Sequence, residues 1–497
     1  MRPGCLPLSR RQLLAGAAGL AATAGLPRFA YARDELARLD ALGQAELVRS
    51  GAASPRELVE AAIARIERLD PVLNAVVATD FGRALERAQG PLPDGPFTGV
   101  PYLLKDLAEY EGVPWRAGTR LFADRVGRTN SEYVKRTLAT GVVVLGKSNT
   151  PEFGLLPNTE AYVYGPARNP WNPDYSPGGS SGGAAVATAS GMVPFAHASD
   201  GGGSIRIPSS NCGLFGMKVS RGRQPEPGPP VPGELGVTHA VTRSVRDSEV
   251  LLQATARSAS EGSNLPPPVP PPDTPPRKLR IALHTSDYYG ERVHPECVAA
   301  VESAARLCAL LGHEVEPAHP PIDGESFIET FLVLWAYIPY AIVEQIRRAT
   351  GAPPPREAFE PWTWGLVEHF RRQPERAVER AVAHMQRVTE QVNAFHASWD
   401  VLLTPTLATP PVRTHELAPD LPFEKLRQLT IDYVAFTPVA NATGGPSMSV
   451  PLHWTPEGLP VGCLFTAPHG DEATLFGLAR QLEAARPWIG RRPPGSA

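Results

Sequence analysis

Two glycine-rich segments place serines where they could act as nucleophiles. The first is Ser176–Gly183, and the second, Asp200–Pro208, has three consecutive glycines directly before Ser204. Glycines at this density let backbone N–H groups turn toward a bound group, because no Cβ blocks the approach and positive φ is permitted. A serine that ends such a run has hydrogen-bond donors for an oxyanion beside it. The pattern is typical of a nucleophilic serine.

Lys105 is the candidate general base. A serine hydroxyl does not attack until a neighbouring group removes its proton, and none of the 12 histidines lies in a recognisable triad context. A lysine can take this role when burial makes it neutral, because desolvation lowers a lysine pKa by several units. The apolar run Val100–Leu104 precedes Lys105 and is expected to bury it. Taken alone, such a lysine is more often a solvated charge at a strand end, so its significance depends on the glycine-rich serines.

Three segments together resemble the amidase-signature family. They are Gly99–Asp106, which fits Gly-x-Pro-x-x-x-Lys-Asp, the paired serines of Gly178–Gly183, and Asp200–Ser204. The resemblance implies that Ser180 is a bridging serine held in a cis peptide and that Ser204 is the nucleophile. Their spacing of 24 residues agrees with the family.

The resemblance also implies a mechanism that uses no metal and no cofactor. Neutral Lys105 takes a proton from Ser180, Ser180 takes one from Ser204, and Ser204 attacks the amide carbonyl. Water then hydrolyses the acyl-enzyme. The expected oxyanion-hole amides are those of Gly201, Gly202, Gly203 and Ser204. The residues expected to support the site by hydrogen bonds are Ser181, Arg206 and Asp200.

The resemblance covers nearly the whole mature chain and is weakest over residues 224–395. The run Ala196–Pro208 and the C-terminal part resemble amidases of the 6-aminohexanoate-cyclic-dimer hydrolase kind. This implies a medium-sized, fairly apolar small-molecule amide as substrate, with linear, cyclic and aryl amides all left open. Substrate specificity is expected in residues 285–395. A homodimer is the oligomer that the family implies.

Two of the motifs also fit the patterns of other functional sites. Gly141–Ser148 fits the pattern of a phosphate-binding loop, but the interval between its glycines is a hydrophobic strand instead of a flexible loop. Gly179–Gly183 fits the nucleophile elbow of an α/β-hydrolase esterase, with Ser181 as nucleophile and Asp400 and His469 as partners. Nothing that flanks those two partners supports the esterase.

Two further classes remain as alternatives to an exported amidase. An exported binding protein on an amidase fold would need no triad, yet all three triad positions are filled. The amidotransferase subunit of tRNA-dependent amidation has the same triad, but it works in the cytoplasm with partner subunits, and the N-terminal segment described below argues against it.

The elements around the motifs predict an α/β protein. Ser54–Glu57 is a capping box that starts an amphipathic helix ending near Pro71. Short buried strands are expected at Val142–Leu145 and Ile281–Leu283, and a helix over about 295–311 leads to a strand at Glu314–Glu316. The family implies a large mixed β-sheet between helical layers, with an inserted, mostly helical region on the substrate side.

Two proline-rich stretches, Gln224–Pro232 and the linker 265–277, cannot be helices or central strands. Beyond the linker, the variable region 285–395 contains Trp335, Trp362 and Trp364. These aromatics could line a substrate pocket, although ordinary helix packing is the commoner role for any one of them.

The first 32 residues read as a twin-arginine signal peptide. Ser9–Leu14 carries the paired arginines, an Ala/Gly-rich run follows to Leu26, and Ala30–Ala32 offers a small-x-small cleavage site. The apolar run is shorter than the roughly 20 residues of a membrane span. We therefore expect export to the periplasm or the exterior, no stable membrane insertion after cleavage, and a catalytic domain over residues 33–497.

Charge and cysteine content exclude several other classes. The formal net charge of −3 gives no electrostatic basis for nucleic-acid binding. Four cysteines remain after Cys5 leaves with the signal, too few for a disulfide scaffold in a chain of this length. Cys297 and Cys308 share a predicted helix at about 16 Å separation, beyond the reach of a bridge. No Cys/His spacing resembles a zinc site.

Overall fold

A computed structural model describes residues 33–225, 232–270, 277–288 and 292–496. The expected signal peptide lies outside the described residues, as do 226–231 and 271–276 of the two proline-rich stretches. The described parts of those stretches contain no helix and no strand.

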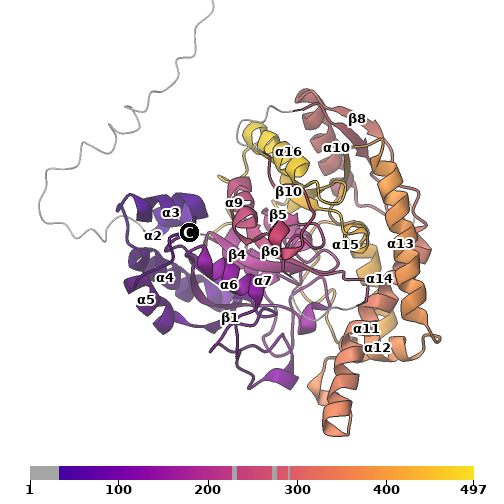
Figure 1. The fold of residues 1–497 in the computed structure, drawn as a ribbon, viewed down its shortest axis with the longest axis horizontal. Coiled ribbons are helices and arrows are strands. Elements are labelled where there is room, and N and C mark those ends of the chain that lie inside the picture. Colours follow the sequence, from indigo (N-terminus) through magenta and orange to yellow (C-terminus); the bar gives the residue numbers. More distant parts are fainter. Residues whose placement is uncertain (1–32, 226–231, 271–276, 289–291, 497) are drawn as a thin grey trace, which may run out of the picture.

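Eleven strands of the described residues form one mixed β-sheet, in the order β1-β3-β2-β4-β6-β5-β10-β11-β9-β7-β8 (Figure 1). The strands are β1 (Val76–Thr79), β2 (Pro101–Lys105), β3 (Val143–Ser148), β4 (Phe195–Asp200), β5 (Phe215–Lys218), β6 (Val237–Thr242), β7 (Arg280–Leu283), β8 (Glu314–Pro317), β9 (Val401–Pro405), β10 (Ser447–Trp454) and β11 (Pro460–Thr466). The predicted large mixed sheet is confirmed.

Helices pack around this sheet. They are α2 (Arg33–Arg38), α3 (Ala41–Arg49), α4 (Pro55–Leu73), α5 (Phe81–Gln89), α6 (Glu132–Ala139), α7 (Gly182–Ala189), α8 (Arg206–Cys212), α9 (Val245–Thr255), α10 (Pro295–Leu310), α11 (Gly324–Thr350), α12 (Pro361–Arg371), α13 (Ala377–His396), α14 (Phe423–Tyr433), α15 (Pro438–Thr443) and α16 (Glu472–Ala485). The predicted strand–helix–strand order over 281–316 is confirmed as β7, α10 and β8.

The helix α4 begins as predicted and ends slightly later. Ser54 accepts from the Glu57 amide, and the Glu57 side chain reaches back to the Ser54 amide, so the capping box is complete. The helix continues past Pro71 to Leu73, because a proline this close to the end removes only one hydrogen bond of the last turns. Asn74 then stops it in the left-handed conformation.

Strand β2 carries a core on each face of the sheet. Leu103 packs with residues of α4 and α7, whereas Tyr102 and Leu104 pack with residues of α3 and α9. Successive side chains of a strand point to opposite faces, so these two clusters sandwich the sheet. Strands β2 and β4 run parallel, with Leu103 opposite Ala196. Their C-terminal ends, Lys105 and Asp200, therefore lie at the same edge of the sheet.

The region predicted to be mostly helical contains α10 to α13. In Figure 1 the orange helices α11 to α13 stand on the opposite side of the molecule from the indigo helices α2 to α5. Helix α11 is long and apolar enough to cross a membrane. Its buried residues, including Phe327 and Leu334, pack against α13 residues such as Met385, so we interpret α11 as a core helix.

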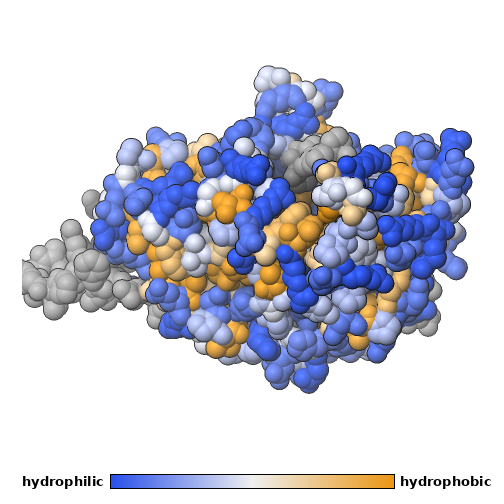
Figure 2. All heavy atoms as spheres, turned by 90° about the horizontal axis from the view of Figure 1, so that it is seen from below, coloured by the Kyte–Doolittle hydropathy of each residue, from blue (hydrophilic) through white to orange (hydrophobic). Residues whose placement is uncertain are grey.

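The surface shown in Figure 2 mixes hydrophilic and hydrophobic side chains, with hydrophobic atoms gathered near the middle of that face. Such a mixture is normal, because more than half of the accessible surface of a folded protein comes from apolar atoms.

Candidate active site

Lys105 ends β2 inside the protein. Its side chain is fully buried, as the apolar run before it predicted. The Nζ atom donates to Ser180 Oγ at 2.7 Å and to Ser199 Oγ at 3.1 Å. Burial lowers the pKa of Lys105 from 10.5 to about 7, although the negative charge of Asp200 opposes the shift. A large fraction of this amine is therefore unprotonated near neutral pH.

Two other lysines are equally buried, but their hydrogen-bond partners differ from those of Lys105. Lys147 on β3 donates to the Ala108 carbonyl, and Lys218 donates to the Val219 carbonyl at 2.9 Å. Burial lowers the pKa of both, to about 8 for Lys147 and about 7 for Lys218. Within the described part of the chain, Lys105 is the buried lysine whose amine meets serine hydroxyls.

Ser180 lies in the turn that leads into α7. The peptide bond between Gly179 and Ser180 is cis, as the family resemblance implied. The turn is packed closely on neighbouring backbone, since a Cβ on Gly179 would lie 1.9 Å from the Asn158 carbonyl oxygen. Only glycine fits such an approach. The hydroxyl of Ser180 also lies against Gly154, whose added Cβ would come within 3.1 Å of it.

Ser181 joins the two serine segments. Its hydroxyl donates to the Ser199 carbonyl at 3.2 Å, and the Ser199 amide donates to Ser181 Oγ at 3.3 Å. Ser199 itself accepts from Lys105 and directly precedes Asp200. The supporting role expected of Ser181 fits this pairing. Ser199 was not identified from the sequence as a partner of the lysine.

The loop that ends at Ser204 is organised by Asp200. The Asp200 carboxylate accepts from the Gly203 amide at 2.8 Å and from the Ile205 amide at 3.0 Å. Asp200 therefore holds the loop, as expected. One expected oxyanion donor needs correction, because the Gly203 N–H already bonds the carboxylate. The amides of Gly201, Gly202 and Ser204 remain as candidate donors.

Arg206 neutralises this buried carboxylate. It donates to both Asp200 oxygens at 2.9 Å, to the Thr437 carbonyl at 2.8 Å and to Asn441 Oδ1 at 2.6 Å. The Arg206 charge is the main factor that holds the pKa of Asp200 well below its usual value against the effect of burial. Asn441 completes the network by donating to Asp200 Oδ1 at 2.9 Å. Asn441 and Thr437 carry no sequence signal of this role.

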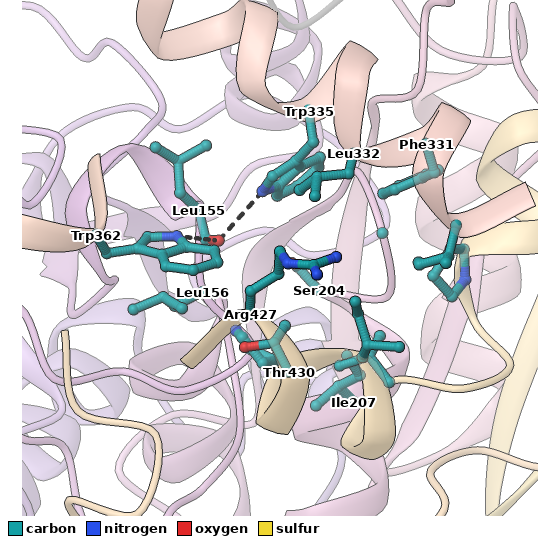
Figure 3. Close-up of a pocket in the computed structure, with 16 residues that line it drawn as sticks. Leu155, Leu156, Ser204, Ile207, Phe331, Leu332, Trp335, Trp362, Arg427 and Thr430 are labelled. Carbon is teal, nitrogen blue, oxygen red and sulfur yellow. Dashed lines mark hydrogen bonds between the residues drawn. The ribbon is translucent and has the colours of Figure 1, made fainter. Parts of the chain in front are cut away.

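A mostly apolar pocket opens beside Ser204 (Figure 3). It contains about 650 Å³ of space free of atoms, part of it open to solvent. Its lining residues are Leu155, Leu156, Pro157, Gly202, Ser204, Ile207, Ile328, Phe331, Leu332, Trp335, Trp362, Arg427, Thr430, Ile431, Val434 and Pro438. Two of the three predicted tryptophans line it. Trp364 does not, and instead packs on Phe359 and donates to the Arg356 carbonyl.

Trp335 and Trp362 belong to two walls of the pocket and share one hydrogen-bond acceptor. Both indole N–H groups donate to the Leu155 carbonyl at 3.2 Å, although the tryptophans lie on different helices. Trp335 also stacks on Phe331 and lies over Gly201, where a Cβ would come within 3.1 Å of the indole. The walls from α11 and α12 are thus attached to the segment beside Ser180 and to the glycine loop.

A third wall comes from α14, which sequence reasoning did not assign to the pocket. Arg427, Thr430, Ile431 and Val434 project from this helix. Its residues lie outside the region 285–395 in which specificity was expected. The spacing of three to four residues is the usual signal of one helix face, but it gives no information on which neighbour that face contacts.

The alternative motif readings do not match the contacts. Strand β3 contains Gly146, Lys147 and Ser148, so this segment is not a flexible phosphate-binding loop. The proposed esterase partners are engaged elsewhere, Asp400 with Arg277 and His469 with the Arg221 carbonyl.

Residues 57–476 match the sequence profile of the amidase family. The chain belongs to this family. The putative amidase AmiC of Mycobacterium leprae (strain TN) is 38% identical to this amidase over 461 residues, which are 92% of this chain and 97% of the relative. The 6-aminohexanoate-cyclic-dimer hydrolase of Paenarthrobacter ureafaciens is 36% identical over 476 residues, 91% of this chain and 96% of the relative.

Solved amidase structures have the same fold. The structure of 6-aminohexanoate cyclic dimer hydrolase complexed with substrate matches this amidase with a TM-score of 0.85 and 34% identity, over 92% of this chain and 99% of the other. A bacterial aryl acylamidase of the amidase-signature family matches with a TM-score of 0.80 and 28% identity, over 91% and 99%. The amidase-signature fold and a hydrolase that acts on C–N bonds other than peptide bonds are thereby confirmed.

Proposed function

We propose that this amidase cleaves its substrate through an acyl-enzyme formed on Ser204, with Ser180 and Lys105 as the proton relay. The observation that carries the proposal is the 2.7 Å hydrogen bond between Lys105 Nζ and Ser180 Oγ, made by an amine whose pKa burial lowers to about 7. A neutral amine has a lone pair for the Ser180 proton, which ammonium lacks.

The proposed reaction passes protons along Ser204, Ser180 and Lys105. Lys105 accepts the Ser180 proton as Ser180 accepts the proton of Ser204, and Ser204 Oγ forms a bond to the carbonyl carbon. The relay returns the proton to the leaving nitrogen as the C–N bond breaks. Water then attacks the acyl carbon as Ser180 and Lys105 take its proton, and the carboxylic acid leaves as its bond to Ser204 Oγ breaks and the relay returns the proton to that oxygen. The amides of Gly201, Gly202 and Ser204 stabilise the oxyanion.

The pocket supports an apolar substrate of medium size. Leucine, isoleucine, phenylalanine and tryptophan side chains make up most of its lining, and burial of apolar substrate surface against them favours binding by about 25 cal/mol for each Å². The names of the relatives point the same way, since they include a cyclic-dimer amide hydrolase and an aryl acylamidase. We propose a linear, cyclic or aryl carboxamide.

A fluorophosphonate probe tests the nucleophile without knowledge of the substrate. The mature protein is treated with the probe, and the adduct is located by peptide mass mapping. We expect the adduct on Ser204, with labelling lost in Lys105→Ala and retained in Ser181→Ala. An adduct on Ser181 would support the esterase reading, and no adduct on any serine would support a binding protein.

A substrate panel tests the bond that is cleaved. Linear, cyclic and aryl amides are offered together with matched esters, and the released amines and alcohols are quantified. We expect amide turnover that disappears in Ser204→Ala. Cleavage of the esters alone would refute the amide substrate class.

We also propose export by the twin-arginine route, on the basis of Ser9–Leu14 and Ala30–Ala32. The full chain is expressed in a bacterial host and the cell fractions are probed for precursor and mature protein. We expect mature protein outside the cytoplasm and retention of the precursor in Arg10→Lys/Arg11→Lys. Cytoplasmic retention of the unaltered chain would contradict the proposal.

A further inference from the structure

Some hydrogen-bond donors of the pocket already have an acceptor in the protein, and others do not. The indole N–H groups of Trp335 and Trp362 both donate to the Leu155 carbonyl. Of the other lining side chains, Ser204, Arg427 and Thr430 carry polar atoms. Arg427 and Thr430 lie one turn apart on α14 and face the same pocket (Figure 3). They form a polar spot in a wall that is otherwise apolar.

Arg427 keeps most of its donors. Its Nη1 donates to Glu329 at 3.0 Å and its Nε donates to Glu424 at 3.0 Å. A guanidinium has five N–H groups, so three of them, including both on Nη2, have no acceptor among the described residues. The side chain is 23% exposed and lines the pocket, where a substrate atom can reach it.

Thr430 adds a second unsatisfied group. Its Oγ1 is buried and has no hydrogen-bond partner within the described part of the chain. A buried hydroxyl without a partner destabilises the protein, so a ligand that supplies a partner is favoured. Thr430 lines the pocket, so this hydroxyl belongs to the same wall as the Arg427 guanidinium.

The charge around Arg427 decides which acceptor fits. Glu329 and Glu424 both pair with this one guanidinium, which leaves a net charge of −1 for the three groups. A substrate carboxylate would meet repulsion from these two acids, whereas a neutral carbonyl accepts N–H donors without adding charge.

We infer that Arg427 and Thr430 form a subsite for a second, uncharged carbonyl group of the substrate. The preferred substrate is then a diamide, in which an apolar spacer separates the scissile amide at Ser204 from the amide carbonyl held on α14. This inference rests on the proposed function for the position of the scissile bond.

Binding to a Ser204→Ala background tests the subsite independently of turnover. The ligands are N,N′-dibutyladipamide, the monoamide N-butylhexanamide and the half-acid N-butyladipamic acid, and calorimetry gives their Kd values. We expect the diamide to bind more tightly than the monoamide. Arg427→Met should reduce that preference by roughly tenfold and Thr430→Val should reduce it severalfold, because each removes donors to one acceptor. Arg348→Met and Thr389→Val, outside the pocket lining, are the matched controls.

A charge change tests the choice of acceptor. Glu329→Gln/Glu424→Gln turns the local charge from −1 to +1 and should raise the affinity for the half-acid by about tenfold or more. Tighter binding of the half-acid than of the diamide without that change would overturn the inference, as would a diamide preference that Arg427→Met leaves intact. Amide turnover with no diamide preference would refute the subsite and leave the proposed function standing. A diamide preference in binding without any turnover would support the subsite and refute the proposed function.

Discussion

Lys105 combines two opposing requirements. Burial makes its amine available as a base near neutral pH, and the same burial makes the protonated form costly. The hydroxyls of Ser180 and Ser199 are its hydrogen-bond partners, and Asp200 is the carboxylate whose charge favours the protonated form.

The reaction rate should depend on pH through Lys105. With its pKa lowered by burial to about 7, the active neutral amine is lost as the pH falls below 7. We expect kcat/KM and the rate of fluorophosphonate labelling to fall about tenfold for each pH unit below this value. Fluorophosphonate labelling rates measured from pH 5 to 9 check the predicted fall on the acid side of the pH profile, and they need no natural substrate. A rate that stays constant down to pH 5 would exclude Lys105 as the base.

Replacement of Lys105 should stabilise the fold at low pH. Its folded pKa of about 7 lies below the unfolded value near 10.5, so between these values the unfolded chain binds the proton and the folded chain does not. Stability from this group therefore rises with pH across that window, and the full cost is present below pH 7. Lys105→Met should raise the free energy of unfolding by up to a few kcal/mol at pH 6, and by less toward pH 10.

Urea unfolding at several pH values measures this difference. The exposed Lys135 offers a control, since Lys135→Met removes a lysine that is 62% exposed at the side chain. A difference between Lys105→Met and the unaltered protein that does not change with pH would show that Lys105 does not carry the cost.

At the scale of elements, the strands bring the reacting groups to one edge and the helices form the pocket. The parallel pairing of β2 with β4 places Lys105 and Asp200 at adjacent strand ends. Helices α11 and α12 reach the same place from the substrate side, and their indoles share the Leu155 carbonyl. The pocket walls therefore depend on contacts between elements far apart in the chain.

Removal of the indole N–H groups should loosen the pocket walls. Trp335→Phe and Trp362→Phe keep an aromatic ring but lose the bond to Leu155, which stabilises the fold by about 1 kcal/mol for each bond. We expect KM for an apolar anilide to rise severalfold in each variant. Trp364→Phe is the control, because this indole bonds the Arg356 carbonyl and lies outside the pocket lining. An equal rise of KM in all three variants would contradict the specific role of Leu155.

At the scale of the whole molecule, the four cysteines of the described residues are buried and free. Burial raises the pKa of each thiol, to about 12 for Cys308 and further for the other three. A protein exported to an oxidising compartment would thus gain no stability from disulfides. The thiolate is the reactive form, so burial protects these side chains by keeping the thiols protonated and by blocking the access of reagents.

The native mature protein should therefore be almost inert to a thiol reagent. We expect no thiol to react with a disulfide reagent in the folded state and four to react in guanidinium. The melting temperature should be the same with and without a reductant. A reductant that lowers the melting temperature would reveal a disulfide in solution.

The sequence by itself determined the family, the fold class and the identity of the candidate triad. Those features are written in short contiguous segments, such as the glycine run before Ser204 and the apolar run before Lys105. Local rules also determined the capping box of α4 and the strand–helix–strand unit β7, α10 and β8. Each of these signals depends on residues close together in the chain.

Only the tertiary structure decided how the site is supported and what surrounds it. Ser199 meets Lys105 across 94 residues and Asn441 meets Asp200 across 241, and no local pattern encodes such pairs. The engagement of the Gly203 amide by Asp200 and the contribution of α14 to the pocket were likewise hidden. Periodicity tells which face of a helix is apolar, whereas the neighbour of that face is set by packing of the whole chain.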